Sequence, residues 1–158
     1  MHPAPPLLLS LLCLTAIAPV AAAQTRDVKT LSLEGARQVA AAAEAAARQR
    51  GWEVAIAVVD PAGGLIVFHR MDGVQHASLE IAVGKARTSA GFRRPSKAMA
   101  DAVGRGVVGL IGAEGMLMME GAMPVVAGGV VVGAIGISGM SGAQDAEIAQ
   151  AGVAALAP

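Results

Sequence analysis

Residues 52–71, WEVAIAVVDPAGGLIVFHRM, decide the fold. The stretch Trp52–Asp60 is β-branched and apolar on both faces, which predicts a strand in the middle of a sheet. The next residues, Pro61–Gly64, have the composition of a tight turn, and Leu65–Met71 then predicts the partner strand of a hairpin. Two strands joined by so short a turn must run antiparallel, so the sheet is predicted to be antiparallel.

A second hairpin is predicted towards the C-terminus, with strands over Met123–Val126 and Val130–Ser138 around Ala127-Gly128-Gly129. Gly104–Gly121 is rich in glycine and methionine without a clear period, which predicts short strand pieces and turns. Helices are predicted over four stretches: Ser32 to Arg50, His76 or Ser78 to about Gly91, Pro95 to Val103, and Gln144–Leu156. The fold class is therefore α+β, with an antiparallel sheet of about five strands and two hairpins, flanked by helices in a single compact domain.

The start of the chain has the features of a secretory signal peptide. Leu7–Val20 carries no charge and ends at Ala21-Ala22-Ala23, a site of the small-x-small kind. The apolar run is too short to cross about 30 Å of hydrocarbon, and the early prolines oppose a buried helix. We expect residues 1–23 to be cleaved, leaving residues 24–158 as one periplasmic or secreted domain.

Composition narrows the chemistry of residues 24–158. They contain no cysteine, which excludes disulfides and thiolate catalysis. The 12 basic and 12 acidic residues cancel, so there is no excess of positive charge for a nucleic-acid partner. After cleavage no second apolar run is long enough to predict a membrane span. The chain is 54% hydrophobic but only 2% aromatic, so the core must be aliphatic and rich in alanine.

The glycines between Gly128 and Gly139 do not form a nucleotide motif. A dinucleotide fingerprint places its glycines at the start of a helix, whereas these fall inside a predicted strand. The stretch Gly136–Met140 also lacks the final glycine of a nucleophile elbow.

Few side chains remain as candidates for function. Lys85-Ala86-Arg87-Thr88 lies within a predicted helix, where the simplest interpretation is a solvated basic face with Thr88 bonded to a carbonyl one turn earlier. His69 and His76, without a carboxylate cluster, argue against structural zinc but suit an iron already held in a porphyrin. Asp72 and Asp145 lie where the chain turns, and an Asx-turn or a helix N-cap would explain both.

An ordered series of short motifs runs over about residues 30–155. They are LSLEGA (31–36), AVVDPAGG (57–64), RMDG (70–73), IAVGKART (81–88), FRRPS (92–96), GAIGISG (133–139) and QD (144–145). This series resembles the GlcG/HbpS-like haem-binding proteins, a domain also found at the C-terminus of PduO-type corrinoid proteins. The resemblance implies a profilin/PAS-like layout, a homo-oligomer, and haem as ligand, with corrinoid as the second choice and a sensor protein as a possible partner.

The resemblance also implies a site. It places Thr88 near the tetrapyrrole or its iron. An N-terminal histidine that ligates iron in some members has no counterpart in Gln24–Arg50, so His76 is the predicted iron ligand. The other predicted contacts are His69, Arg70, Arg87 and Arg93, with arginines pairing the propionates.

Three functions follow from these observations. The first is exported haem binding for capture, buffering or redox sensing. The second is an isomerase- or lyase-type enzyme acting on a small organic acid through Asp72, His76 or Arg70. The third is an oligomeric accessory protein without catalysis. The sequence favours the first, and a binding role over an enzymatic one.

Overall fold

The computed structural model describes residues 26–156, and the predicted signal peptide lies outside them. The elements in chain order are α1 (Leu33–Gln49), β1 (Ala55–Val59), β2 (Leu65–Arg70), α2 (Ala77–Phe92), α3 (Lys97–Gly104), the 3-10 helix η1 (Val108–Gly112), β3 (Ala122–Ala127), β4 (Val130–Ser138) and α4 (Gly142–Ala154). None of the helices among these residues is both long and apolar enough to span a membrane.

The strands form one sheet in the order β2-β1-β4-β3, and every neighbouring pair is antiparallel. The predicted α+β class and both hairpins are confirmed, and β1 is central and buried at every position. The sheet has four strands where about five were predicted. The difference lies in Gly104–Gly121, which forms η1 and turns because its backbone passes through positive φ at Gly106 and Gly115.

Both hairpin turns use the residues that their geometry requires. In the β1–β2 turn, Asp60 Oδ1 accepts the backbone N–H groups of Ala62 and Gly64, each at 2.8 Å. In the β3–β4 turn, Gly128 and Gly129 have φ of 59° and 77°. Two successive residues with positive φ form the turn that matches the twist of a hairpin, so glycine is required there.

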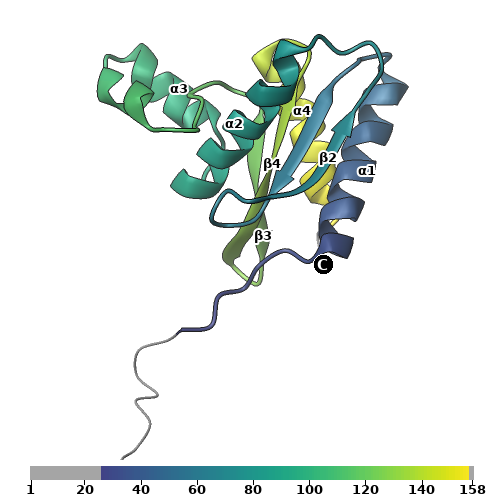
Figure 1. Ribbon diagram of the computed structural model, residues 1–158, viewed down its shortest axis with the longest axis horizontal. Helices are drawn as coiled ribbons and strands as arrows, with labels where there is room; N and C mark the ends of the chain where they lie inside the picture. Colours follow the sequence, from purple (N-terminus) through teal and green to yellow (C-terminus); the bar gives the residue numbers. More distant parts are fainter. Residues whose placement is uncertain (1–25, 157–158) are drawn as a thin grey trace, which may run out of the picture.

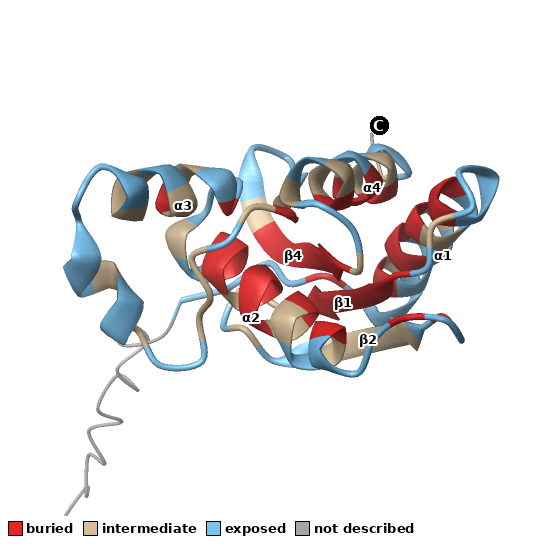
Figure 2. Ribbon diagram, turned by 90° about the horizontal axis from the view of Figure 1, so that it is seen from above, coloured by how far each residue is buried: buried red, intermediate tan, exposed pale blue. Residues whose placement is uncertain are grey.

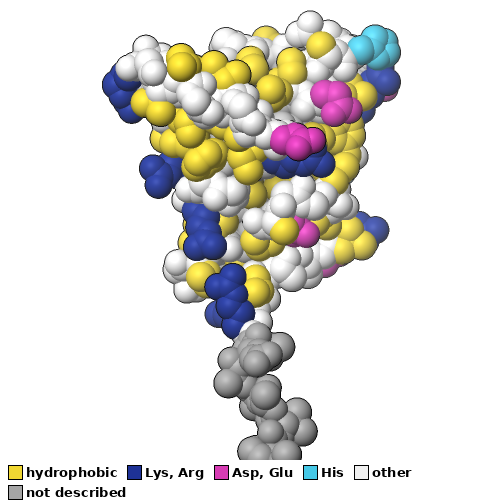
Figure 3. All heavy atoms as spheres, turned by 60° about the vertical axis from the view of Figure 1, so that its left-hand side comes forward, with side chains coloured by type: hydrophobic (Ala, Val, Ile, Leu, Met, Phe, Trp, Pro, Cys, Tyr) yellow, Lys and Arg dark blue, Asp and Glu magenta, His cyan; other side chains and the backbone are white. Residues whose placement is uncertain are grey.

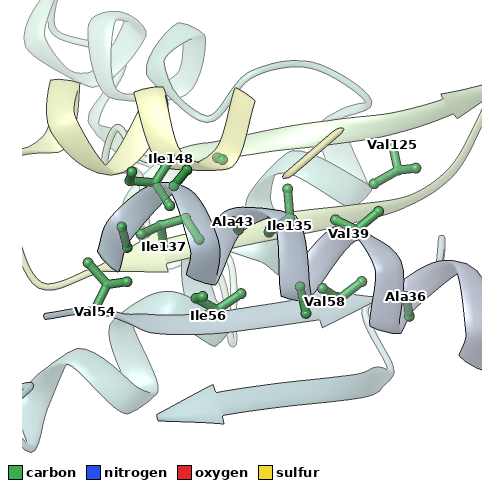
Figure 4. Close-up of a cluster of buried hydrophobic side chains, with 14 of the residues drawn as sticks. Ala36, Val39, Ala43, Val54, Ile56, Val58, Val125, Ile135, Ile137 and Ile148 are labelled. Atoms are coloured by element: carbon green, nitrogen blue, oxygen red, sulfur yellow. The ribbon is translucent and has the colours of Figure 1, made fainter. Parts of the chain in front are cut away.

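Helices cover both faces of the sheet, with α1 and α4 on one face and α2 on the other (Figures 1 and 2). On the first face α1 contributes Val39 and Ala43, α4 contributes Ile148, and β1 and β4 contribute Ile56 and Ile135 (Figure 4). Small alanines on α1 let the helix lie close to the sheet. The buried residues of α1 recur at helical spacing from Ala36 to Ala47, whereas its first residue, Leu33, is 48% exposed.

The second face is built from even smaller residues. Gly136 of β4 lies directly under α2, where an added Cβ would stand 2.2 Å from the carbonyl oxygen of Ala82. The large apolar residues of α2 are not fully buried, because Leu79 and Val83 are only half-buried. The buried residues of α2 include polar ones, among them Ser78, Lys85, Thr88 and Ser89.

Trp52 lies where the end of α1 meets α4. Its ring packs against the core on that face, and the Arg50 guanidinium stands over it, 5.6 Å from the ring centroid. Arg50 also pairs with Glu147 of α4 at 2.5 Å. Both helices are therefore tied together beside the start of β1.

Candidate functional site

A buried ion pair joins α2 to α4 beyond the end of β4. Lys85 Nζ lies 2.7 Å from Asp145 Oδ2, and the two side chains are 2% and 1% exposed. Lys85 also donates to the carbonyl oxygen of Ile137 at 3.0 Å, and Asp145 Oδ1 accepts the backbone N–H of Met140 at 3.0 Å. Lys85 is thus not part of a solvated basic face, and that interpretation was wrong. The N-cap interpretation of Asp145 was also wrong, because Ser141 caps α4.

Burial of this pair affects both the pKa of Asp145 and the space available to neighbouring residues. Removal from water raises the pKa of Asp145 above its ordinary value, while the bonds from Lys85 and from the Met140 N–H act in the opposite direction. Gly121 passes so close that an added Cβ would lie 2.7 Å from Lys85 Nζ, and its φ of +129° also favours glycine. A residue larger than glycine at position 121 would therefore collide with the pair.

An open hollow of about 390 Å³, which we call the α2 hollow, lies over this pair at the start of α2. Its polar lining includes Lys85, Asp145 and Ser78, and the Ser78 Oγ is buried without a hydrogen-bond partner. Met119 and Met140 also line the hollow and are 46% and 38% exposed. Exposed thioethers beside convergent polar groups are typical of a small-molecule site.

His76 lies at the rim of the α2 hollow. It immediately precedes α2, is exposed, and makes no capping bond to the helix. Its neighbours Gln75 and Ala77 both line the hollow. His76 itself is not among the residues that line the hollow, so it stands next to the cavity in the chain with an imidazole open to solvent.

His69 is engaged on the opposite face of the sheet. Its Nδ1 lies 2.7 Å from Glu44 Oε2 of α1, and the ring is 33% exposed. The Arg48 guanidinium, with a smaller contribution from His69, holds the pKa of Glu44 below its ordinary value. The two histidines are thus not brought together, and residues 26–156 contain no group of three His, Asp or Glu suited to a metal ion.

Thr88 is fully buried against the chain that leads to β3. Its Oγ1 lies 2.9 Å from the carbonyl oxygen of Gly84, as predicted, and 2.8 Å from that of Leu117. It also accepts the backbone N–H of Leu117 at 2.9 Å. Through these hydrogen bonds the Thr88 hydroxyl attaches the segment around Leu117 to α2. A contact of Thr88 with a tetrapyrrole stays a prediction.

Two of the predicted arginines, Arg87 and Arg93, lie further along α2 than the hollow next to His76. Arg87 donates through Nε to the carbonyl oxygen of Gly63 at 3.2 Å. Arg93 follows the last residue of α2 and lines a separate hollow of about 340 Å³. Because His76 and Arg93 stand on either side of the 16 residues of α2, they are about 26 Å apart along its axis. Arg70 is exposed at the end of β2.

The enzyme hypothesis required His76 to share a pocket with Arg70 or Asp72. Five of the hollows on residues 26–156 have neither Arg70 nor Asp72 in their lining. These five hollows therefore do not bring His76 together with Arg70 or Asp72. The groups that do converge, Lys85, Asp145 and Ser78, were not predicted as a site.

The fold is an α+β domain with an antiparallel sheet between helices, and hollows lie at both ends of α2. Residues 31–154 match the family model described as "Haem degrading protein HbpS-like". The chain belongs to this HbpS-like family, and the resemblance predicted from the motifs is confirmed.

The relatives extend over most of the chain. Protein GlcG of Escherichia coli (strain K12) is 39% identical over 106 residues, which are 67% of this chain and 79% of GlcG. A double mutant of HbpS from Streptomyces reticuli is 36% identical with a TM-score of 0.82, covering 90% of this chain and 99% of that structure. A PduOC:Heme complex is 29% identical with a TM-score of 0.74, covering 80% of this chain and 95% of that structure.

Proposed function

We propose that this protein binds haem, and that it does so outside the cytosol after cleavage of residues 1–23. The observation that carries the proposal is the likeness, over 80% of the chain, to PduOC in its complex with heme. Export is supported by the uncharged run Leu7–Val20 and the small residues that follow it. A haem-binding domain in that location would serve in capture, buffering or redox sensing, as an oligomer or with a sensor partner.

The residues around the α2 hollow fit a haem. The exposed imidazole of His76 is an ordinary axial ligand for haem iron. Ile81, Met119 and Met140 offer apolar side chains on which a porphyrin face would lie. When bound, haem would supply the iron that exchanges electrons or binds small molecules. Arg87 and Arg93 line other hollows, so the propionates of that haem would pair with other groups.

Titration with hemin tests the proposal, using protein purified after expression of the full sequence. The expected result is a saturable Soret shift at about one haem per chain. His76→Ala should remove the spectrum of a histidine-ligated iron. His69→Ala is the matched control, because His69 is held by Glu44 on the other face of the sheet, and it should leave the spectrum unchanged.

The outcomes test haem binding separately from the assignment of His76 as the axial ligand of the iron. Absence of a saturable shift would overturn haem binding altogether. A normal spectrum in His76→Ala, or a spectrum lost in His69→Ala, would overturn the assignment of His76 and leave haem binding in place.

A further inference from the structure

The other end of α2 carries a second cavity, which we call the strap hollow. It forms where the segment that precedes α1, Arg26–Lys29, runs beside the start of β4 and the end of α2. We propose that the strap hollow binds an organic acid by its carboxylate, with the apolar body of the acid resting on the hollow's valines. This site goes beyond haem binding and does not depend on it.

The charge of the strap hollow favours an anion. Its lining includes Arg26, Lys29 and Arg93 against a single acidic residue, Asp27. Within residues 26–156 none of these three cationic side chains takes part in an ion pair. Residues 1–25 contain no Asp or Glu that would supply a carboxylate side chain. Figure 3 shows a face on which basic side chains, interspersed with hydrophobic ones, continue down to the start of the described chain.

The remaining lining of the strap hollow is apolar. Val28 and Val130 line it and are 61% and 47% exposed, which leaves hydrophobic surface in contact with water. Pro61, Ala90 and Val131 complete this surface. A volume of about 340 Å³ is at the lower end of the range of small-molecule pockets. The combination suits a short apolar molecule with one anionic group.

The backbone of Arg93 is an independent reason to assign a ligand to this hollow. Arg93 has a φ of 54°, and among residues 26–156 no other residue except glycine has a positive φ. Helices usually place glycine at such a left-handed end, because any Cβ there raises the energy. An arginine kept at a strained position is explained if its guanidinium is needed, and guanidinium binds carboxylate through two parallel hydrogen bonds.

Calorimetric titration with octanoate tests the site. Protein purified after expression of the full sequence should bind octanoate saturably at about one molecule per chain. 1-Octanol, which lacks the charge, and acetate, which lacks the apolar body, should each bind at least about tenfold more weakly. Equal affinity for octanoate and 1-octanol, or no saturable binding of octanoate, would overturn the proposal.

Variants locate the binding. Arg93→Ala and Arg26→Ala should each weaken octanoate binding about tenfold, since each removes a charged hydrogen-bond donor. Arg94→Ala is the matched control, because Arg94 is exposed and bonded to the carbonyl oxygen of Phe92 and does not line the hollow. Unchanged affinity in both Arg93→Ala and Arg26→Ala would place octanoate elsewhere and contradict the proposal.

Two further measurements test whether Arg93 acts in ligand binding or only in folding, and whether octanoate binding is independent of haem binding. Arg93→Gly should weaken octanoate binding while raising Tm by about 3 °C, because glycine relieves the strained backbone. A lower Tm together with unaltered binding would show that Arg93 serves the fold alone. His76→Ala should bind octanoate with the affinity of the unmodified protein. Loss of haem binding can therefore be distinguished from loss of octanoate binding at the strap hollow.

Discussion

Lys85 and Asp145 connect two helices that lie on opposite faces of the sheet, through one contact of 2.7 Å beyond the end of β4. The pair therefore links two helical layers that lie on either side of the sheet. Buried ion pairs contribute little net stability when intact, yet are costly to break on one side only. The pair thus holds α2 and α4 in a defined position relative to each other beneath the α2 hollow.

The first prediction concerns this pair. Lys85→Met should lower the free energy of unfolding by about 3 kcal/mol, because it leaves the Asp145 carboxylate buried without its partner. The double variant Lys85→Met with Asp145→Leu should recover most of that loss. Urea denaturation measures both. Lys97→Met, at the exposed pair with Asp101, is the control and should change stability by less than about 0.5 kcal/mol. A double variant no more stable than the single one would contradict this account.

The second prediction concerns the packing of α2 on the sheet. Gly136→Ala should destabilise the protein by about 2 kcal/mol or more, since the new methyl would meet the backbone of Ala82 and Ala86. Gly109→Ala offers a matched control, because an added Cβ there has no neighbour within 4 Å. Thermal unfolding of the two variants provides the comparison. Similar Tm values for both would show that α2 does not pack as closely as described.

The third prediction concerns pH. The pKa of Glu44 is lowered in the folded protein, chiefly by its bond with Arg48, so its contribution to stability is complete above the ordinary value of 4.5 and is lost as the pH falls through the lowered folded pKa. Glu44→Gln should therefore cost about 0.5 kcal/mol at pH 7 and almost nothing at about pH 3, a small effect because the side chain is partly exposed. Denaturation curves across this range test the sign. A difference that grows towards acid pH would refute it.

The fourth prediction concerns the start of α4. Ser141 Oγ accepts the backbone N–H of Gln144, and the Gln144 side chain bonds back to the Ser141 N–H. Ser141→Ala should cost about 1 kcal/mol in the free energy of unfolding. Ser141→Asp, which keeps an acceptor at the cap, should cost clearly less. Equal losses in both variants would exclude capping as the cause.

Much of the fold was predictable because its signals are local. The continuous apolar run of β1 and its turn at Asp60 and Gly64 depend on residues close together in sequence, as does the cap of α1 by Ser32. The segment after α3 was not predictable in the same way. Its glycines permit many backbone paths, and no periodic pattern selects one of them.

The candidate site was harder to predict because its contacts are distant in sequence. Lys85 and Asp145 are 60 residues apart, and a lysine in an alanine-rich helix is equally compatible with solvent. One signal was present: Ser78 and Lys85 are seven residues apart, which is two helical turns, and Ala82 lies between them on the same face. A lysine on a stripe of small residues indicates burial, but only the fold supplies the carboxylate that makes it possible.

Because aromatic residues are scarce, the intrinsic fluorescence of the protein comes from very few side chains. Trp52 is the one tryptophan in the sequence, and there is no tyrosine, so nearly all intrinsic fluorescence comes from a single indole. That indole stands beside Arg50, where α1 and α4 are tied together. Its emission reports, without any label, the moment at which those helices separate. A ligand that enters either hollow and leaves the emission unchanged has left this corner of the molecule undisturbed.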